Sequence, residues 1–385
     1  MARSGNIAAT LVLAAVCVAL WFAPPPQVSF VQEGETRRAR VVEIDDSTVE
    51  THGLLRFGTQ HLKVRLLDGP RKGETFSAVN EIRAQMDLDK HFVPGDTAVV
   101  VERGDEDPKE DVIIARDHWR AGWALAIFAA FAALLCVFGG FTGAKALFSF
   151  VFSALVIWKG VIPLALRGWP ASWTCFGAVC LLSAVIMYLV AGWTRKGLAA
   201  FAGTAVGVFA GLAMAHAFGR LMHINGATLP YVQALLYSGY EFLDLQDVFF
   251  GAMALASSGA VMDLAMDIAS GVEEVARHNP ALPRRELLLS GFRIGRSVVG
   301  TMTTTLLLAY SGGYITLLMM FAAQGTHPLD IVNSTLVSAE LVKTLIGSFS
   351  LVLVAPFTAV AAALVFSPRR RGDPLNVGTA QPLHP

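Results

Sequence analysis

Two aspartates spaced one helical turn apart in an apolar stretch are the residues of this sequence best suited to chemistry. Asp263 and Asp267 lie between Gly251 and Gly271, and their spacing places both carboxylates on one helix face. Small residues continue that face at three- and four-residue steps, namely Ala252, Ala256, Gly259, Ala260 and Ser270. An ionised side chain near the bilayer centre costs at least about 2.5 kcal/mol, so we expect this face to turn toward protein or water.

The next apolar stretch supplies groups that could act with these acids. Arg296 is predicted to lie about as deep in the membrane as Asp267, which makes a contact between the two possible. Three hydroxyls follow, at Thr301, Thr303 and Thr304. The functional interpretation is a proton or cation site. In it Asp263 binds the ion, while Asp267 and Arg296 set the local charge and the threonines offer oxygen ligands.

An alternative interpretation gives the two acids a structural role. In it Asp263 and Asp267 are tied to arginines at the inner interface and to the hydroxyl-rich neighbouring helix, and they fix the register of two helices. An ion site predicts a hydrated cavity that reaches Asp263. A structural role predicts a dry and fully paired helix face.

A second pattern of small residues lies in the stretch from Leu198 to Phe218. Gly203, Gly207 and Gly211 are spaced four apart, so a neighbouring backbone can approach closely along this face. Helix packing is the default interpretation. A sliding seam for a moving transporter helix is the alternative.

Glycine and proline also interrupt two of the later apolar stretches. Gly312 and Gly313 break one of them, and Pro356 breaks the last. Transporters use broken helices to expose backbone groups to ions, but the same residues are common in ordinary spanning helices. Both interpretations stay open.

Metal and enzyme chemistry find little support in the sequence. Soft, imidazole and carboxylate side chains gather near one membrane edge, but their spacing matches no defined metal motif: Met214, His216, Met222, His223, Glu241, Asp244 and Asp247. All four cysteines fall in apolar runs, and neither HExxH nor GxSxG occurs. We therefore expect no catalytic residues, no metal and no cofactor.

The composition indicates which elements must position these residues. Hydrophobic residues make up 54% of the chain and charged residues 16%, and the apolar residues gather in runs of about twenty, as spanning helices require. The runs are Ile7 to Ala23, Trp119 to Phe138, Leu147 to Leu166, Trp173 to Trp193, Leu198 to Phe218, Val248 to Gly271, Val298 to Ala323 and Thr344 to Phe366. The sequence thus predicts an α-helical integral membrane protein with about eight transmembrane helices.

The sequence predicts four segments, which are an N-terminal anchor, a β-rich domain, a helical membrane domain and a tail. Residues 1–23 are interpreted as an uncleaved anchor rather than a cleaved signal peptide, because Leu20 to Ala23 lacks a small-x-small pair. Residues 24–118 form a β-rich domain, residues 119–366 form seven spanning helices, and residues 367–385 form a cytoplasmic disordered tail.

The positions of lysine and arginine predict an orientation, since short loops rich in these residues stay in the cytoplasm. With the N-terminus inside, the inner segments hold Arg3, Lys145, Arg195, Lys196, Arg277, Arg284, Arg285, Arg293, Arg296 and Arg369 to Arg371. We therefore expect a bacterial inner-membrane protein whose two termini are cytoplasmic and whose β-rich domain is extracytoplasmic.

The β-rich domain reads as a small barrel. Five short runs of strand-forming residues are separated by turn signals such as Pro94-Gly95-Asp96: Ala39 to Ile44, His61 to Leu67, Glu74 to Val79, Thr97 to Val101 and Val112 to Ala115. Their number and length suit an OB or SH3 barrel. The domain has few aromatic residues and the chain has no net charge, so nucleic acid is not expected as a partner.

The order of motifs resembles the YibE/F-like family of multi-pass membrane proteins. In the β-rich domain the resemblance rests on Leu67 to Glu74, Val79 to Glu81 and Val93 to Asp96. In the membrane part it rests on Gly259 to Met266, Asn279-Pro280, Ser290 to Arg296 and Gly300 to Tyr310. The resemblance implies the architecture but no settled activity.

The leading functional prediction is a permease or channel-like transporter with an intramembrane acidic site for protons or cations. The alternative is a non-transporting scaffold whose exported barrel docks an envelope protein. The expected partners are the lipid bilayer, a cation or small solute, and that envelope protein. The sequence indicates no oligomeric state.

Overall fold

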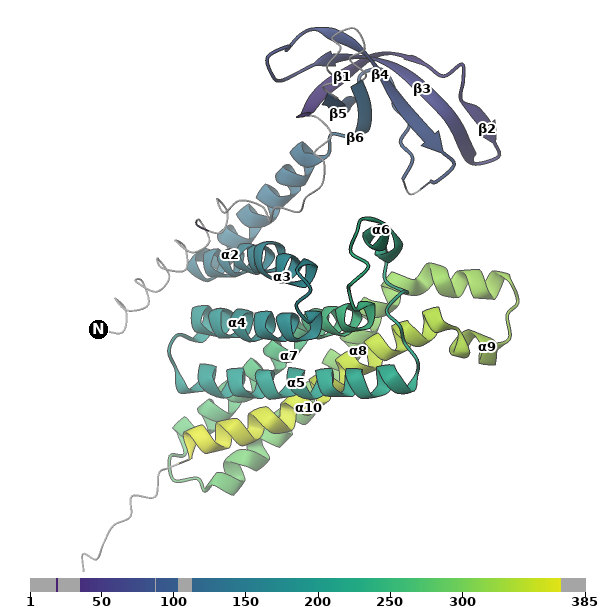
Figure 1. Cartoon of the computed structure of the whole chain (residues 1–385). Coiled ribbons are helices and arrows are strands. Elements are labelled where there is room, and N and C mark those ends of the chain that lie inside the picture. The colour runs from purple at the N-terminus through teal and green to yellow at the C-terminus, as the bar shows by residue number, and fades with distance from the viewer. Residues whose placement is uncertain (1–18, 20–34, 87, 103–112, 368–385) are drawn as a thin grey trace, which may run out of the picture. The chain divides into compact units, whose positions relative to one another are not determined.

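The computed structural model describes residues 19, 35–86, 88–102 and 113–367 of the chain (Figure 1). The chain divides into two compact units, Gln27–Phe138 on one hand and Met1–Pro26 with Gly139–Pro385 on the other.

The first unit contains a closed β-barrel. Its strands are β1 (Glu35–Asp45), β2 (Glu50–His52), β3 (Leu55–Leu66), β4 (Thr75–Arg83), β5 (Thr97–Glu102) and β6 (Ile113–His118). The sheet order is β1-β5-β6-β4-β3-β2, and an additional pairing of β1 with β3 closes five of the strands, with β2 attached to β3. The pairs are antiparallel except that of β4 with β6. A five-stranded Greek-key barrel is the architecture of the OB fold.

The barrel follows from alternation along the strands. In β3, buried Leu62, Val64 and Leu66 alternate with exposed His61 and Lys63, as a strand with one face on a core requires. The predicted barrel of five strands is confirmed. Strand β2 was not predicted, because Glu50-Thr51-His52 is polar and exposed.

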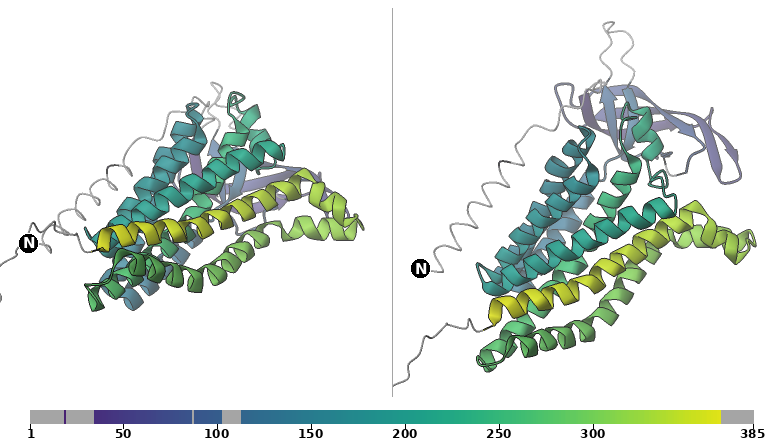
Figure 2. Two further views of the ribbon diagram at one scale, coloured as in Figure 1. Left: turned by 90° about the horizontal axis from the view of Figure 1, so that it is seen from below. Right: turned by 60° about the horizontal axis from the view of Figure 1, so that its bottom comes forward.

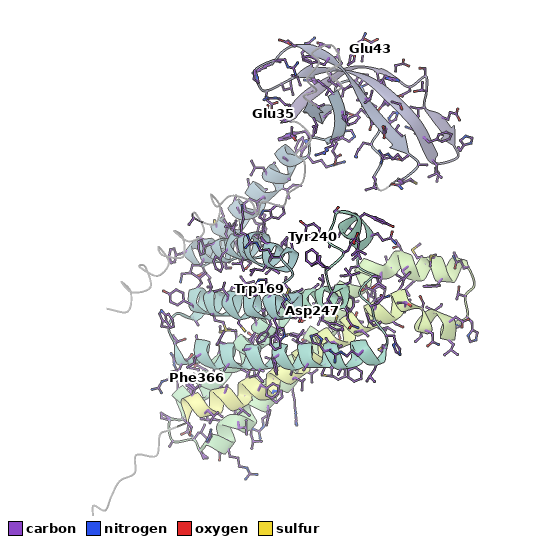
Figure 3. All side chains as sticks on the ribbon, in the orientation of Figure 1. Glu35, Glu43, Trp169, Tyr240, Asp247 and Phe366 are labelled. Atoms are coloured by element: carbon purple, nitrogen blue, oxygen red, sulfur yellow. The ribbon has the colours of Figure 1, made fainter. Side chains whose placement is uncertain are left out.

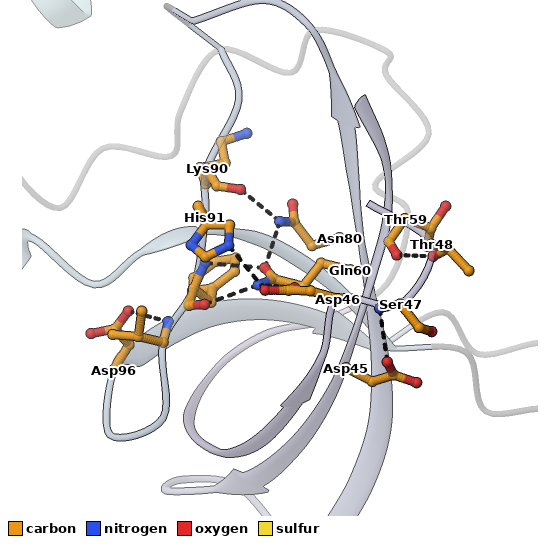
Figure 4. Close-up of polar contacts among 12 residues, drawn as sticks. Asp45, Asp46, Ser47, Thr48, Thr59, Gln60, Asn80, Lys90, His91 and Asp96 are labelled. Carbon is orange, nitrogen blue, oxygen red and sulfur yellow. Dashed lines mark hydrogen bonds and ion pairs between the residues drawn. The ribbon is translucent and has the colours of Figure 1, made fainter. Parts of the chain in front are cut away.

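A buried polar network holds the segment between β4 and β5 (Figure 4). Gln60 Nε2 donates to Asp46 Oδ1 at 2.8 Å and to Phe92 O at 2.9 Å, while Phe92 N donates to Gln60 Oε1 at 3.1 Å. Asn80 Nδ2 donates to Lys90 O at 2.7 Å. Each buried amide is therefore satisfied, and the segment is fixed although it has no strand of its own.

The remaining elements are helical. They are α2 (Ala121–Val156), the π-helix η1 (Ile157–Val161), α3 (Ile162–Leu166), α4 (Ala171–Ala191), α5 (Arg195–Leu221), α6 (Val232–Tyr237), α7 (Leu245–His278), α8 (Arg284–Ala323), α9 (Pro328–Asn333) and α10 (Thr335–Phe366). Among the described residues, 6 helices are long and apolar enough to cross a membrane, counting Ala121–Leu166 as one.

These helices cover seven of the eight apolar runs. The run from Ile7 to Ala23 lies, apart from Ala19, outside the described residues, as does the tail beyond Ser367. Two predicted spans share the helix Ala121–Leu166, whose backbone leaves the helical region at Gly140 with φ 54° and ψ −130°. The total of eight spans therefore stays a prediction.

Helix α7 lies at the centre of the second unit. It packs against α4, α5, α8 and α10, and α10 in turn packs along α5 and α8 (Figures 1 and 2). Fully buried Val261, Leu264, Ala265 and Ile268 recur at three- and four-residue steps on α7. This apolar stripe is the core of the bundle.

The interruptions predicted in the later helices differ in outcome. Helix α8 has non-helical backbone angles at Tyr314, one residue after Gly313. Helix α10 runs through Pro356 as one element. Only the glycine pair therefore coincides with a local break.

Candidate functional site

Asp263 and Asp267 lie on an exposed face of α7, near the middle of this 34-residue helix. The small residues Ala252, Ala256 and Gly259 are exposed as well, whereas Ala260 and Ser270 of the predicted stripe are half-buried, and Ala260 packs against the bundle core. A Cβ atom added at Gly259 would meet nothing within 4 Å. The face is therefore open at Gly259, one turn from Asp263.

Neither carboxylate has a hydrogen bond or an ion pair within the described part of the chain. Arg296 is exposed on α8 and forms no ion pair with Asp267 among these residues. Helices α7 and α8 do meet nearby, since a Cβ atom on Gly295 would lie 3.3 Å from Ile268 Cδ1. Helices α7 and α8 pack together as expected, but the Asp267–Arg296 contact that the sequence made possible is not formed.

The three threonines are split between two environments. The exposed Thr301 and Thr304 hydroxyls donate to Val298 O at 2.9 Å and Gly300 O at 3.1 Å on their own helix. Thr303 Oγ1 is buried and has no hydrogen-bond partner in the described residues. Each hydroxyl keeps lone pairs that can accept from a water or ligate a cation.

The glycine face of α5 lies directly against α10. A Cβ atom on Gly207 would lie 2.9 Å from Val354 Cβ, and one on Gly203 or Gly211 would overlap the hydroxyl of Thr358 or Ser350. The two backbones thus approach so closely that no side chain fits between them. The same holds for Gly291 of α8 against Ala359 of α10.

The bundle also contains an ion pair within α10, formed by a lysine and a glutamate. Lys343 Nζ donates to Glu340 Oε2 at 3.0 Å and lies 5.5 Å from the ring centroid of Tyr310 on α8. Glu340 belongs to the second turn of α10. An acid and a base three residues apart in an apolar helix were the available signal.

The cluster near the other end of α7 does not assemble as a metal site. Asp244 caps α7 by accepting from Gln246 N and Asp247 N, and His216 Nε2 lies 4.0 Å from Asp247 Oδ1. Within the described ranges, no three His, Cys, Asp or Glu side chains are placed to hold a metal ion. The Ser172 hydroxyl donates to Asp247 and not to His216, so these three side chains lack the order of a serine hydrolase triad.

Together these positions define an acidic face of α7 whose two carboxylates have no ion pair among the residues that the structure describes. Charges inside a membrane face protein or water, because lipid cannot solvate them. A carboxylate in such a place can take up a proton or a cation. The Glu340–Lys343 pair is by contrast neutralised locally.

Comparison with known proteins identifies a matching family. Residues 127–368 match a family model described as YibE/F-like protein. The comparisons with curated proteins and with solved structures found no match.

Proposed function

The chain belongs to the YibE/F-like family, and on this premise we propose that it is a permease or channel-like transporter that moves protons or cations past Asp263. The observation that carries the proposal is the exposed acidic face of α7, whose two carboxylates have no partner in the described ranges. A scaffold would gain nothing from two exposed carboxylates in a spanning helix, whereas an ion path requires them to be accessible.

The proposed roles of the two aspartates follow from their positions along α7. Asp263 is the deeper acid and binds the ion, and Asp267 lies one turn closer to the end of α7 at His278. That end carries Glu273, which pairs with Lys196 at 3.5 Å and with Arg277 at 3.5 Å. The positive-inside rule supports placing it, with both termini, on the cytoplasmic side of a bacterial inner membrane and the barrel outside.

Flux through reconstituted vesicles tests the proposal. We expect Asp263→Asn to reduce proton or cation flux by at least about tenfold, because the neutral amide cannot exchange the charge that the path needs. The measurement is the response of a pH-sensitive dye, repeated with alkali and divalent cations, in vesicles that contain equal amounts of folded protein.

Asp330→Asn is the matched control, since Asp330 is an exposed aspartate on the short helix α9, outside the six candidate spans. Its flux should equal that of the unmodified protein. Equal flux in a folded Asp263→Asn protein would remove the ion path from consideration.

The second candidate is a scaffold whose barrel docks an envelope protein. It is favoured by a groove of about 370 Å³ across β1, β3 and β4, lined by Glu43, Asp45, His61 and Lys63 among others. This candidate predicts that a photo-crosslinker at His61 traps one partner of defined mass in cells. The same probe at Glu50 on β2 should trap none, and Asp263→Asn should leave the trapping unchanged.

A further inference from the structure

A pocket of about 310 Å³ opens at the end of the bundle where α4 and α7 begin. Its lining includes Trp169, Ser172, Trp173, His216, Phe242 and Asp247. Figure 3 labels Trp169 and Asp247, which lie at this end of α4. Asp263 is sixteen residues further along α7, roughly 24 Å at the helical rise, so the pocket is separate from the acidic face.

The floor of the pocket is the nearly buried carboxylate of Asp247, whose basic neighbour in the pocket lining is His216, with Nε2 at 4.0 Å from Oδ1 and so beyond hydrogen-bond distance. The Asp247 side chain is 14% exposed, and among the described residues no lysine or arginine pairs with it. Ser172 N donates to Oδ2 at 3.0 Å and the Ser172 hydroxyl donates to Oδ1. An ionised carboxylate has about four acceptor positions, so two remain for a ligand.

The walls of the pocket are aromatic. Trp169, Trp173 and Phe242 are 62%, 57% and 62% exposed, so their rings are available to a ligand. No lysine or arginine lines the pocket. Ring faces attract cations, and a carboxylate below them completes the features that bind an ammonium group.

An apolar groove adjoins the pocket. It has a volume of about 350 Å³, is lined by residues such as Leu164, Gly177 and Leu181, and shares Trp169 and Trp173 with the pocket. A ligand that binds both has a cationic end and an apolar part. A bare metal ion would leave the groove and the aromatic walls without a role.

We propose that this pocket holds the ammonium group of an amphiphile whose apolar part lies in the adjoining groove. Two sources share this chemistry, the headgroup of phosphatidylethanolamine and a free alkylammonium ion. The proposal is independent of the ion path past Asp263 and would stand if that path failed its test.

Calorimetry on the full-length protein tests the proposal. The protein is placed in nanodiscs of phosphatidylglycerol, which has no ammonium group, and titrated with tetramethylammonium. We expect saturable binding, and none for tert-butanol, which has a similar shape but no charge. Asp247→Asn should weaken binding by at least about tenfold, because it removes the charge while its amide oxygen can still accept from Ser172 N.

Trp169→Ala is a second test of the proposal, and it replaces an exposed residue and not a buried one. It should weaken binding about two- to fivefold, the effect of losing one exposed cation–π contact. Trp158→Ala is the matched control, since Trp158 is 63% exposed on η1 and lines neither the pocket nor the groove. Its affinity should be unchanged.

Nanodiscs that contain phosphatidylethanolamine separate the two sources. Weaker apparent binding of tetramethylammonium there means that the lipid headgroup occupies the pocket, and unchanged binding means that a free ion does. No saturable binding in phosphatidylglycerol, equal binding of tert-butanol, or an unchanged affinity in a folded Asp247→Asn protein would each overturn the proposal. In that case the tryptophans serve only as interfacial anchors.

Discussion

At the scale of single residues, one carboxylate ties the turn after β3 to strand β1. Asp68 Oδ1 accepts from Arg38 N at 2.9 Å and Asp68 Oδ2 accepts from Arg38 Nε at 2.8 Å. The hydrogen bond from the Arg38 guanidinium holds the pKa of the Asp68 carboxyl below its ordinary value. Arg38 also lies over the Trp119 ring, at 5.2 Å from its centroid. Asp68 therefore adds a side-chain link between β1 and the turn after β3 to the strand pairing that closes the barrel.

This lowered pKa predicts acid sensitivity of the barrel. Above the unfolded-state value of about 3.9 the stabilisation is fully present, and it is lost as the pH falls through the lower folded-state pKa. Asp68→Asn should cost about 1 kcal/mol near neutral pH and should remove this part of the pH dependence. The measurement is hydrogen exchange of β1 and β3 in the full-length protein, corrected for intrinsic rates.

Glu74→Gln is the control for this prediction, because Glu74 is exposed beside the same turn. Its pH dependence should match that of the unmodified protein. If Asp68→Asn retained the full acid sensitivity, the Arg38–Asp68 contact would not be its cause.

At the scale of elements, the contact between α5 and α10 determines how tightly the bundle closes. We expect Gly207→Ala to destabilise the protein by about 1–3 kcal/mol, because the added methyl overpacks against Val354. Val354→Ala in the same chain should recover part of the loss. Thermal unfolding of the detergent-solubilised protein measures both.

Gly177→Ala is the matched control for the α5 substitution. Gly177 also lies in a spanning helix, but a Cβ atom there would meet nothing within 4 Å. It should be neutral or slightly stabilising, since alanine favours the helix. Equal losses for both substitutions would show that helix propensity and not close packing is being measured.

The helices were predictable from apolar runs because lipid requires each spanning backbone to satisfy its own hydrogen bonds. Their ends were not. Helix α7 continues past Gly271 to His278, and α8 begins at Arg284 and not near Val298. Charged turns beyond the apolar run stay helical through tertiary contacts such as that of Glu273 with Lys196, which hydropathy does not register.

The candidate site was also predictable only in part. Spacing alone places Asp263 and Asp267 on one face. It could not show that this face is open, or that Arg296 forms no ion pair with either acid, because both depend on how α7 and α8 pack. The sequence likewise could not show that Asp247 accepts from Ser172 N, because this contact depends on how α4 packs against α7.

At the scale of the whole molecule, the orientation is open to a direct test. We expect protease added to intact spheroplasts to cleave in the barrel region, while a tag at the C-terminus stays protected until the membrane is broken. Cleavage of the tag with protection of the barrel would reverse the topology. The basic end of the bundle, with Lys196, Arg277, Arg284 and Arg285, is the reason for the expected direction.

The close fit of α10 onto α5 also bears on how the protein is made. Helix α5 ends at Leu221 and α10 at Phe366, so 145 residues, the difference of these numbers, are synthesised between them. At about 5–20 residues per second this takes roughly 7–29 s. During that time the glycine face of α5 has no α10 to cover it. The nascent chain therefore needs lipid or an insertion factor to shield this face until its last helix arrives.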